Sequence, residues 1–177
     1  MKKTFLLLMI LLGVVSMANA KTAIVYFSAT GTTKALAQNA AKALNADIFE
    51  IIPEKPYTSD DLDWHNSKSR TSIECNDKTI HPGIKNKIEL SAYDTVVVAF
   101  PIWWNNIPNI LLTFAEKTDL SGKKVVCICT SGSSSISNAE REFKAAVSKT
   151  VDFRPGKRFA AETGEAELKR FLERALK

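Results

Sequence analysis

Long hydrophobic runs are absent from this sequence except at its very start. There, Met1-Lys2-Lys3 is basic, Phe5–Val15 is apolar, and Ala18-Asn19-Ala20 has the small-x-small pattern of a signal-peptidase site. The apolar run is too short to span a bilayer comfortably, and no lipobox cysteine follows it. The sequence therefore predicts a signal peptide at residues 1–20, one domain at residues 21–177, and export to the periplasm or the medium, with no stable membrane span after cleavage. An uncleaved N-terminal anchor is the alternative.

Cysteine and histidine are scarce. The three cysteines are an odd number and form no Cys-x-x-Cys pair, and the two histidines, His65 and His81, stand alone. Neither a disulfide framework nor a metal site is therefore predicted. Cys127 and Cys129 fall two apart in an expected strand and are interpreted as buried thiols on one face. No Gly-x-Ser-x-Gly string occurs and no histidine follows His81, which excludes a serine-hydrolase elbow.

Charge of one sign does not dominate either. The net charge is +5, and Lys2 and Lys3 of the predicted signal peptide supply two of these charges. The other basic residues are scattered, and no basic run is interleaved with aromatic residues, so nucleic-acid binding is not predicted. Two nucleotide-binding motifs are also missing, because neither Gly-x-x-x-x-Gly-Lys-[Ser/Thr] nor Gly-x-Gly-x-x-Gly occurs.

One loop nevertheless has the chemistry of an anion site. The apolar run Ile24–Phe27 stops abruptly at Ser28-Ala29-Thr30-Gly31-Thr32-Thr33, and a helix-forming segment begins at once. The first turn of a helix has backbone N–H groups without intrahelical partners, and the helix dipole makes that end electropositive. The four hydroxyl side chains can add donors, and Gly31 lets the backbone close on a ligand. We predict that these six residues hold a phosphate monoester. An ordinary turn capped by Ser or Thr is the alternative.

Apolar runs and helix-forming segments alternate along the rest of the chain. Besides the opening run, strands are expected at residues 46–52, 95–100, 124–130 and 157–161. Helices are expected at residues 33–44, 59–75, 108–117, 137–149 and 165–176, with one short helical turn at residues 84–90. Ser137 and Glu140 are expected to form a capping pair. The alternation predicts an α/β fold, a three-layer, doubly wound, five-stranded parallel sheet in the order 2-1-3-4-5.

Residues 53–90 form the most polar part of the chain. Arg70 and Glu74 stand four residues apart and are interpreted as a surface ion pair on a helix. Trp64 is interpreted as a residue at the mouth of a pocket.

Two further loops are expected at the edge of the sheet where ligands bind, because the carboxyl ends of parallel strands meet there. The loop after residues 95–100 contains Pro101, Ile102, Trp103, Trp104 and Asn105. The loop after residues 124–129 contains Thr130, Ser131, Gly132 and Ser133. Two tryptophans in a turn are difficult to explain as core, and indole rings can stack on a planar heterocycle. One of the two, Trp103, is expected to plug the sheet edge.

The opening strand and loop resemble the phosphate-binding loop of flavodoxins, a family that is itself an example of the strand-end rule. The family pattern is matched in order by Ile24, Val25, Tyr26, Ser28, Gly31, Thr33 and Ala37. The double-tryptophan loop and the Ser-Gly loop resemble the second and third flavin loops of a flavodoxin-like family. The resemblance implies FMN as the cofactor, with Trp104 facing the isoalloxazine ring and the Asn105 backbone near its N5 and O4 atoms. Many flavodoxins have Gly after the stacking aromatic, and Asn tolerates positive φ better than most residues.

The resemblance also implies a function. We expect an FMN-binding protein of electron transfer or small-molecule reduction, with no catalytic side chain, because the cofactor performs the redox chemistry. Electron-carrier flavodoxins are typically strongly acidic, and this chain is not, which favours an oxidoreductase with a small acceptor over a carrier with a protein partner. A non-redox binding module for a phosphorylated ligand is the alternative.

Overall fold

The computed structural model describes residues 21–177, so the predicted signal peptide at residues 1–20 lies outside the described part. Five parallel strands form one sheet in the order β2-β1-β3-β4-β5, which confirms the predicted fold class. The strands are β1 (Thr22–Tyr26), β2 (Asp47–Glu50), β3 (Thr95–Pro101), β4 (Lys124–Thr130) and β5 (Asp152–Phe159). The helices are α1 (Thr32–Leu44), α2 (Arg70–Asn76), α3 (Asn109–Lys117), α4 (Ser137–Ala146) and α5 (Glu165–Ala175). Within residues 21–177, no helix is long and apolar enough to cross a bilayer.

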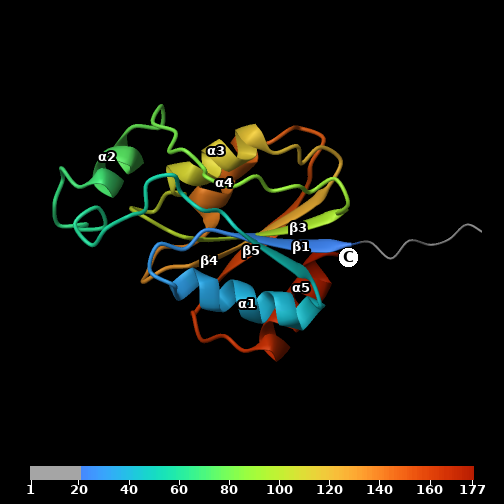
Figure 1. Cartoon of the computed structure of the whole chain (residues 1–177). Helices are drawn as coiled ribbons and strands as arrows, with labels where there is room; N and C mark the ends of the chain where they lie inside the picture. The colour runs from blue at the N-terminus through green and yellow to red at the C-terminus, as the bar shows by residue number, and fades with distance from the viewer. Residues whose placement is uncertain (1–20) are drawn as a thin grey trace, which may run out of the picture.

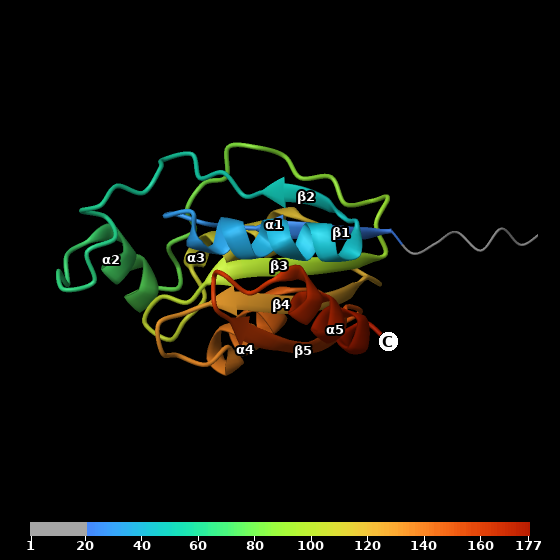
Figure 2. The ribbon, with the colours of Figure 1, turned by 90° about the horizontal axis from the view of Figure 1, so that it is seen from below.

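Helices cover both faces of the sheet. In Figures 1 and 2, α3 and α4 lie on one face and α1 and α5 lie on the other. This arrangement explains why β3 is a continuous apolar run, since helices cover the strand on both sides and all its residues except Pro101 are buried. Successive residues of β3 point to opposite faces, so Val98 joins the core under α3 and α4 while Val97 joins the core under α1 and α5.

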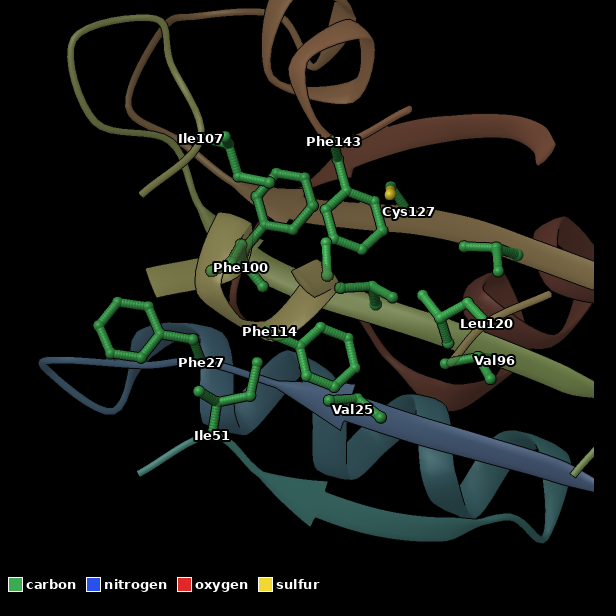
Figure 3. Close-up of a cluster of buried hydrophobic side chains, with 14 of the residues drawn as sticks. Val25, Phe27, Ile51, Val96, Phe100, Ile107, Phe114, Leu120, Cys127 and Phe143 are labelled. Atoms are coloured by element: carbon green, nitrogen blue, oxygen red, sulfur yellow. The ribbon is translucent and has the colours of Figure 1, made fainter. Parts of the chain in front are cut away.

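The core under α3 and α4 is rich in aromatic residues. Figure 3 shows Phe100 of β3, Phe114 of α3 and Phe143 of α4 in this cluster, and all three are buried. The Phe114 and Phe143 rings are stacked with their centroids 6.5 Å apart. Burial of each such side chain stabilises the fold by about 1.5–3 kcal/mol. This packing therefore fixes β3, α3 and α4 relative to one another directly below the carboxyl edge of the sheet.

The helix predicted over residues 59–75 is wrong in extent, because only Arg70–Asn76 is α-helical. Two Asx turns interrupt the expected helix. The side-chain oxygens of Asp63 and Asn66 each accept a hydrogen bond, at 2.9 Å, from the backbone N–H two residues further on. Such local bonds compete with helical hydrogen bonding. The helix begins only where Ser69 supplies a side-chain cap.

The short helical turn predicted at residues 84–90 is also wrong. Ile84 pairs with Pro53 in an antiparallel bridge, and the Lys85 N–H donates to the Ile52 carbonyl at 2.8 Å. The segment therefore runs extended beside the chain that follows β2. Burial alternates along most of it, a period of two that is typical of extended chain and was present in the sequence.

The predicted capping pair of Ser137 and Glu140 is not formed. Helix α4 begins after Ile136 without a side-chain cap. The Glu140 carboxylate instead accepts a hydrogen bond from the Gly156 N–H at 2.6 Å, where the pairing of β4 with β5 shifts register. That bond holds an irregular β5, which begins at Asp152, several residues before the predicted strand.

All three cysteines are buried and none is in a disulfide. Cys127 and Cys129 of β4 lie in the same core cluster, which confirms the predicted buried thiols on one face. Burial raises the pKa of Cys75 from 9.0 to about 11 and the pKa of Cys129 to about 12. Burial raises the pKa of Cys127 as well. The thiols therefore stay protonated in the folded protein under ordinary conditions.

The raised thiol pKa values predict slow alkylation and a loss of stability in alkali. Because the thiolate is the nucleophile, a pKa of about 11 instead of 9.0 makes Cys75 react about a hundredfold more slowly with iodoacetamide at pH 8 than in the unfolded chain. Above pH 9 the unfolded chain releases these protons before the folded chain does, so the free energy of unfolding falls as the pH rises. Mass spectrometry after timed alkylation and urea unfolding at pH 7–10.5 measure the two effects. Equal alkylation rates with and without urea would contradict the buried assignment.

Candidate functional site

The structure brings the three predicted loops together at the carboxyl edge of the sheet. The Thr33 and Thr130 hydroxyl oxygens are 2.8 Å apart in a buried contact that links the start of α1 to the end of β4. The Ile102 N–H donates to the Thr130 carbonyl at 2.9 Å, which links the end of β4 to the loop after β3. In both views α2 lies beyond the same edge, past the ends of the strands (Figures 1 and 2).

The loop after β1 presents backbone donors that the protein itself does not use. Gly31 is the N-cap residue of α1 and has a φ of 87°, and no side chain in the described part of the chain caps the helix. The Ser28 hydroxyl accepts a bond from the Gly31 N–H at 3.1 Å, outside the helix. The amides of Thr32 and Thr33 find no acceptor among residues 21–177. Among residues 21–177, no Ser or Thr side chain therefore caps α1, and the helix end remains electropositive.

The hydroxyl groups of this loop divide into two kinds. Thr30 and Thr32 are exposed, with their hydroxyl oxygens 3.1 Å apart, and Ser28 and Ala29 are partly exposed. Thr33 is fully buried, so its hydroxyl is not available to a ligand, contrary to the expected donor role. It anchors the loop instead.

The loop after β3 forms a tight turn with unusual backbone angles. The Trp103 N–H donates to the Asn106 carbonyl at 3.1 Å, and the Asn106 N–H donates back to the Trp103 carbonyl at 2.8 Å. The two residues between them, Trp104 and Asn105, have φ values of 48° and 61°. Positive φ at both central residues defines a type I′ turn. Asn105 tolerates this conformation, whereas for a bulky residue such as Trp104 it costs about 1–3 kcal/mol and marks a candidate functional position.

The two tryptophans of the turn have different environments. Trp103 packs edge-on against Phe27, with centroids 5.6 Å apart, and against Tyr57, with centroids 5.2 Å apart. It plugs the edge of the sheet, as predicted. Trp104 remains 38% exposed, so the strained residue is also the one whose ring is open to a ligand.

An open cavity of about 370 Å³ joins the first two loops. Its walls are Thr30, Leu62, Trp64, Thr71, Ile102, Trp103 and Trp104. None of these side chains is charged, and the volume falls in the range of about 300–1,000 Å³ that is typical of small-molecule sites. Trp64 is 67% exposed, which agrees with its predicted place at the mouth. A slightly larger cavity of about 430 Å³ lies elsewhere, between residues 84–91 and 117–123, and contains no residue of the three loops.

The other predicted site residues do not line this cavity. Pro101 ends β3 and is partly buried, and Asn105 is exposed at the tip of the turn. Thr130 is buried and contacts Thr33, so its role is structural. The remaining residues of the third loop are partly or fully exposed: Ser131, Gly132 and Ser133.

A network under Trp103 was not predicted as part of the site. The Tyr57 hydroxyl donates to the Glu74 carboxylate at 2.7 Å, and the Arg70 guanidinium donates to the same carboxylate at 2.7 Å and lies 3.9 Å from the Tyr57 ring centroid. Burial, with the nearby Glu74 charge, raises the pKa of Tyr57, so the phenol remains a donor. The ion pair is as predicted, but Glu74 is only 4% exposed, so its predicted surface location is wrong.

Comparison with known proteins gives consistent results. A family model described as flavodoxin matches residues 21–175. A candidate flavoprotein from Bacteroides eggerthii is 40% identical, with a TM-score of 0.84 over 89% of this chain and 98% of that one. A second, from Bacteroides uniformis, is 41% identical, with a TM-score of 0.82 over 87% of this chain and 98% of that one. A flavoprotein from Lactobacillus acidophilus, solved in complex with FMN, shares the fold at 16% identity, with a TM-score of 0.66 over 87% of this chain and 99% of that one. No curated protein matches the chain significantly.

The Tyr57 network predicts a site-specific loss of stability. Tyr57→Phe keeps the ring but removes the donor to one oxygen of the buried Glu74 carboxylate and leaves Arg70 to bond the other oxygen, which should lower the free energy of unfolding by about 1.5–3 kcal/mol. Tyr93→Phe is the matched control, because its hydroxyl donates at 2.7 Å to the exposed carboxylate of Asp47, and exposed pairs contribute about 0–1 kcal/mol. Urea unfolding measures both variants. Equal losses would show that the Glu74 contact adds nothing beyond a surface bond.

Proposed function

Because this chain belongs to the flavodoxin family, we propose that it binds FMN at the carboxyl edge of its sheet and uses the cofactor to reduce a small molecule. The observation that carries the proposal is a pairing of two features at one cavity. The first loop has amides without acceptors among residues 21–177 and reaches the cavity through Thr30, and the second loop presents the exposed ring of Trp104 to the same cavity. A phosphate joined to a planar ring fits this pair of features. The FMN complex of the Lactobacillus acidophilus protein, which shares the fold, supports this choice of ligand.

The residues of the first loop would hold the phosphate by neutral donors. The amides of Thr32 and Thr33 lie at the positive end of α1, whose first turn contains no acidic side chain. The Thr30 and Thr32 hydroxyls are exposed beside them. Gly31 has no atom within 4 Å of the position that a Cβ would take, so the backbone is open to a ligand there. An anion needs no lysine or arginine in such a cradle.

The residues of the second loop would orient the ring. Bound FMN supplies reversible acceptance and release of electrons, and the protein supplies binding, orientation and shielding. Trp104 offers a flat apolar surface, and the uncharged cavity walls would exclude ionic groups from the ring face. No ionisable side chain lines this cavity, so we propose no catalytic side chain. The weakly basic net charge of +5 for the full chain lacks the acidic field of a protein-docking carrier, which supports a small acceptor.

We also propose that the chain is exported and that its mature form begins at Lys21. The basic, apolar and small-x-small segments of residues 1–20 support this. The Lys21 backbone nitrogen is 3.2 Å from the Asp94 carboxylate. Cleavage after Ala20 would turn this nitrogen into an ammonium group beside an existing carboxylate, so the domain is compatible with a chain that starts there.

Titration of the purified protein with FMN and with riboflavin tests the proposed cofactor. We expect a yellow complex, with FMN bound more tightly than riboflavin because only FMN has the phosphate. Thr32→Glu puts a negative charge into the cradle and should weaken FMN binding by about 1–4 kcal/mol without weakening riboflavin binding. Gln38→Glu is the matched control, since it adds the same charge to an exposed position of α1 beyond the first turn. A protein that binds other phosphorylated ligands but not FMN would support a non-redox module instead.

Mapping the N-terminus of the expressed protein tests the export proposal. We expect mass spectrometry of the periplasmic or secreted fraction to show a chain that begins at Lys21. Bulky residues at Ala18 and Ala20 should block cleavage, because the peptidase requires small side chains at these positions. An intact Met1 in a cytoplasmic product would contradict the proposal.

A further inference from the structure

The left-handed turn at Trp104 and Asn105 is held from outside by α4. Asn138, in the first turn of that helix, directs its side-chain N–H2 group at the turn. Its Nδ2 atom is 3.1 Å from the Asn105 carbonyl oxygen and 2.8 Å from the Asn106 side-chain oxygen. These two contacts are on consecutive residues, so the peptide between them cannot rotate without breaking at least one hydrogen bond.

Glu142 supports the same contact one helical turn later. Its carboxylate accepts from Asn138 Nδ2 at 3.2 Å and from the Ile107 backbone N–H at 3.0 Å. Lys78 donates to this carboxylate at 3.2 Å, so the charge is paired. The Arg141 guanidinium donates to the side-chain oxygen of Asn138, which orients the amide group with its nitrogen toward the turn. The second half of the turn and the residue after it are therefore held by side chains of α4.

This support matters because the turn is not intrinsically favoured. Neither Trp104 nor Asn105 is glycine, and both have positive φ, a conformation that persists only where the surroundings impose it. The Asn138 contact imposes this conformation on Asn105, which is next to the exposed indole of Trp104. A carbonyl and a peptide plane that are fixed beside a flavin ring act on its electronics as fixed dipoles.

We propose that Asn138, backed by Glu142, is a positioning residue that locks the Trp104–Asn105 turn and thereby sets the affinity for oxidised FMN and the midpoint potential. The proposal rests on the proposed binding of FMN at this turn. The locked turn is preformed for the oxidised cofactor. Removal of the lock lets the turn take other conformations, which weakens the binding of oxidised FMN more than that of the reduced form. The midpoint potential therefore rises when the lock is removed.

The test compares Asn138→Ala and Asn138→Asp with the wild-type protein and with Lys144→Ala. Lys144 is exposed on the same helix and has no hydrogen bond to the turn among residues 21–177. For Asn138→Ala we expect about tenfold weaker binding of oxidised FMN. If reduced FMN is unaffected, that factor corresponds to a rise of about 30 mV in the two-electron potential. Asn138→Asp should shift both quantities further, since its carboxylate would face the Asn105 carbonyl and the Glu142 carboxylate.

Two further measurements separate positioning from folding. Amide hydrogen exchange in the apoprotein should become faster at Asn106 and Ile107 in both Asn138 variants, and the melting temperature should stay close to that of Lys144→Ala. Equal weakening of oxidised and reduced FMN, with an unchanged potential, would overturn the positioning role. Unchanged exchange together with unchanged affinity would overturn the lock itself. If the wild-type protein binds no FMN, the proposed function fails and this proposal fails with it, whereas FMN binding with unaltered Asn138 variants rejects this proposal alone.

Discussion

Backbone N–H groups at the start of α1 have no acceptor within the described protein, and the rest of the site is arranged around that constraint. The amides stay open because Gly31, rather than a side chain, is the N-cap. The loop can remain uncapped only if it is held elsewhere, and the buried contact between the Thr33 and Thr130 hydroxyls does so. The Thr33 hydroxyl thus anchors the loop. The result is a rigid loop whose backbone N–H donors lack an acceptor, which is the physical requirement for binding an anion.

The second loop is arranged differently: backbone hydrogen bonds close its turn, but the backbone of the two central residues is strained. The turn closes with two reciprocal bonds between Trp103 and Asn106, and the cost lies in the positive φ of the residues between them. Packing of Trp103 on Phe27 and Tyr57 fixes one end of the turn. The strained backbone of Trp104 is therefore held by its well-packed neighbour Trp103 rather than by contacts of the Trp104 ring. Such strain is typical of positions that are selected for function rather than for stability.

Sequence signals predicted the parts of this molecule whose causes are local. The runs at β3 and β4 are apolar throughout because both faces are covered, and this pattern indicates a parallel sheet without further information. The strand-to-helix turn at Gly31 is equally local. The helix prediction was wrong at residues 59–69 because the side chains of Asp63 and Asn66 accept hydrogen bonds from nearby backbone N–H groups, which composition alone does not show.

The supporting residues could not be predicted because their partners are distant in the chain. Asn138 contacts a turn 33 residues earlier, and Tyr57 meets Glu74 17 residues later. Nothing in the local sequence of either residue marks it as part of the site. The ion pair of Arg70 and Glu74 was visible from its spacing, but its burial depends on the packing of Tyr57 and was not. Residues that could touch a ligand were thus easier to find than the residues that hold them.

Burial of the thiols also bears on the proposed export. An odd number of cysteines is unusual in an oxidising compartment, where thiolates form disulfides readily. Here burial suppresses disulfide formation, since all three thiols are buried and burial raises the pKa of each. Cys127 and Cys129 share one face of β4, but they follow each other along an extended strand, where alternate residues are too far apart for comfortable disulfide geometry. Free cysteines in the core are therefore compatible with a folded protein outside the cytoplasm. Unwanted disulfide formation is confined to the unfolded chain, before the sheet forms.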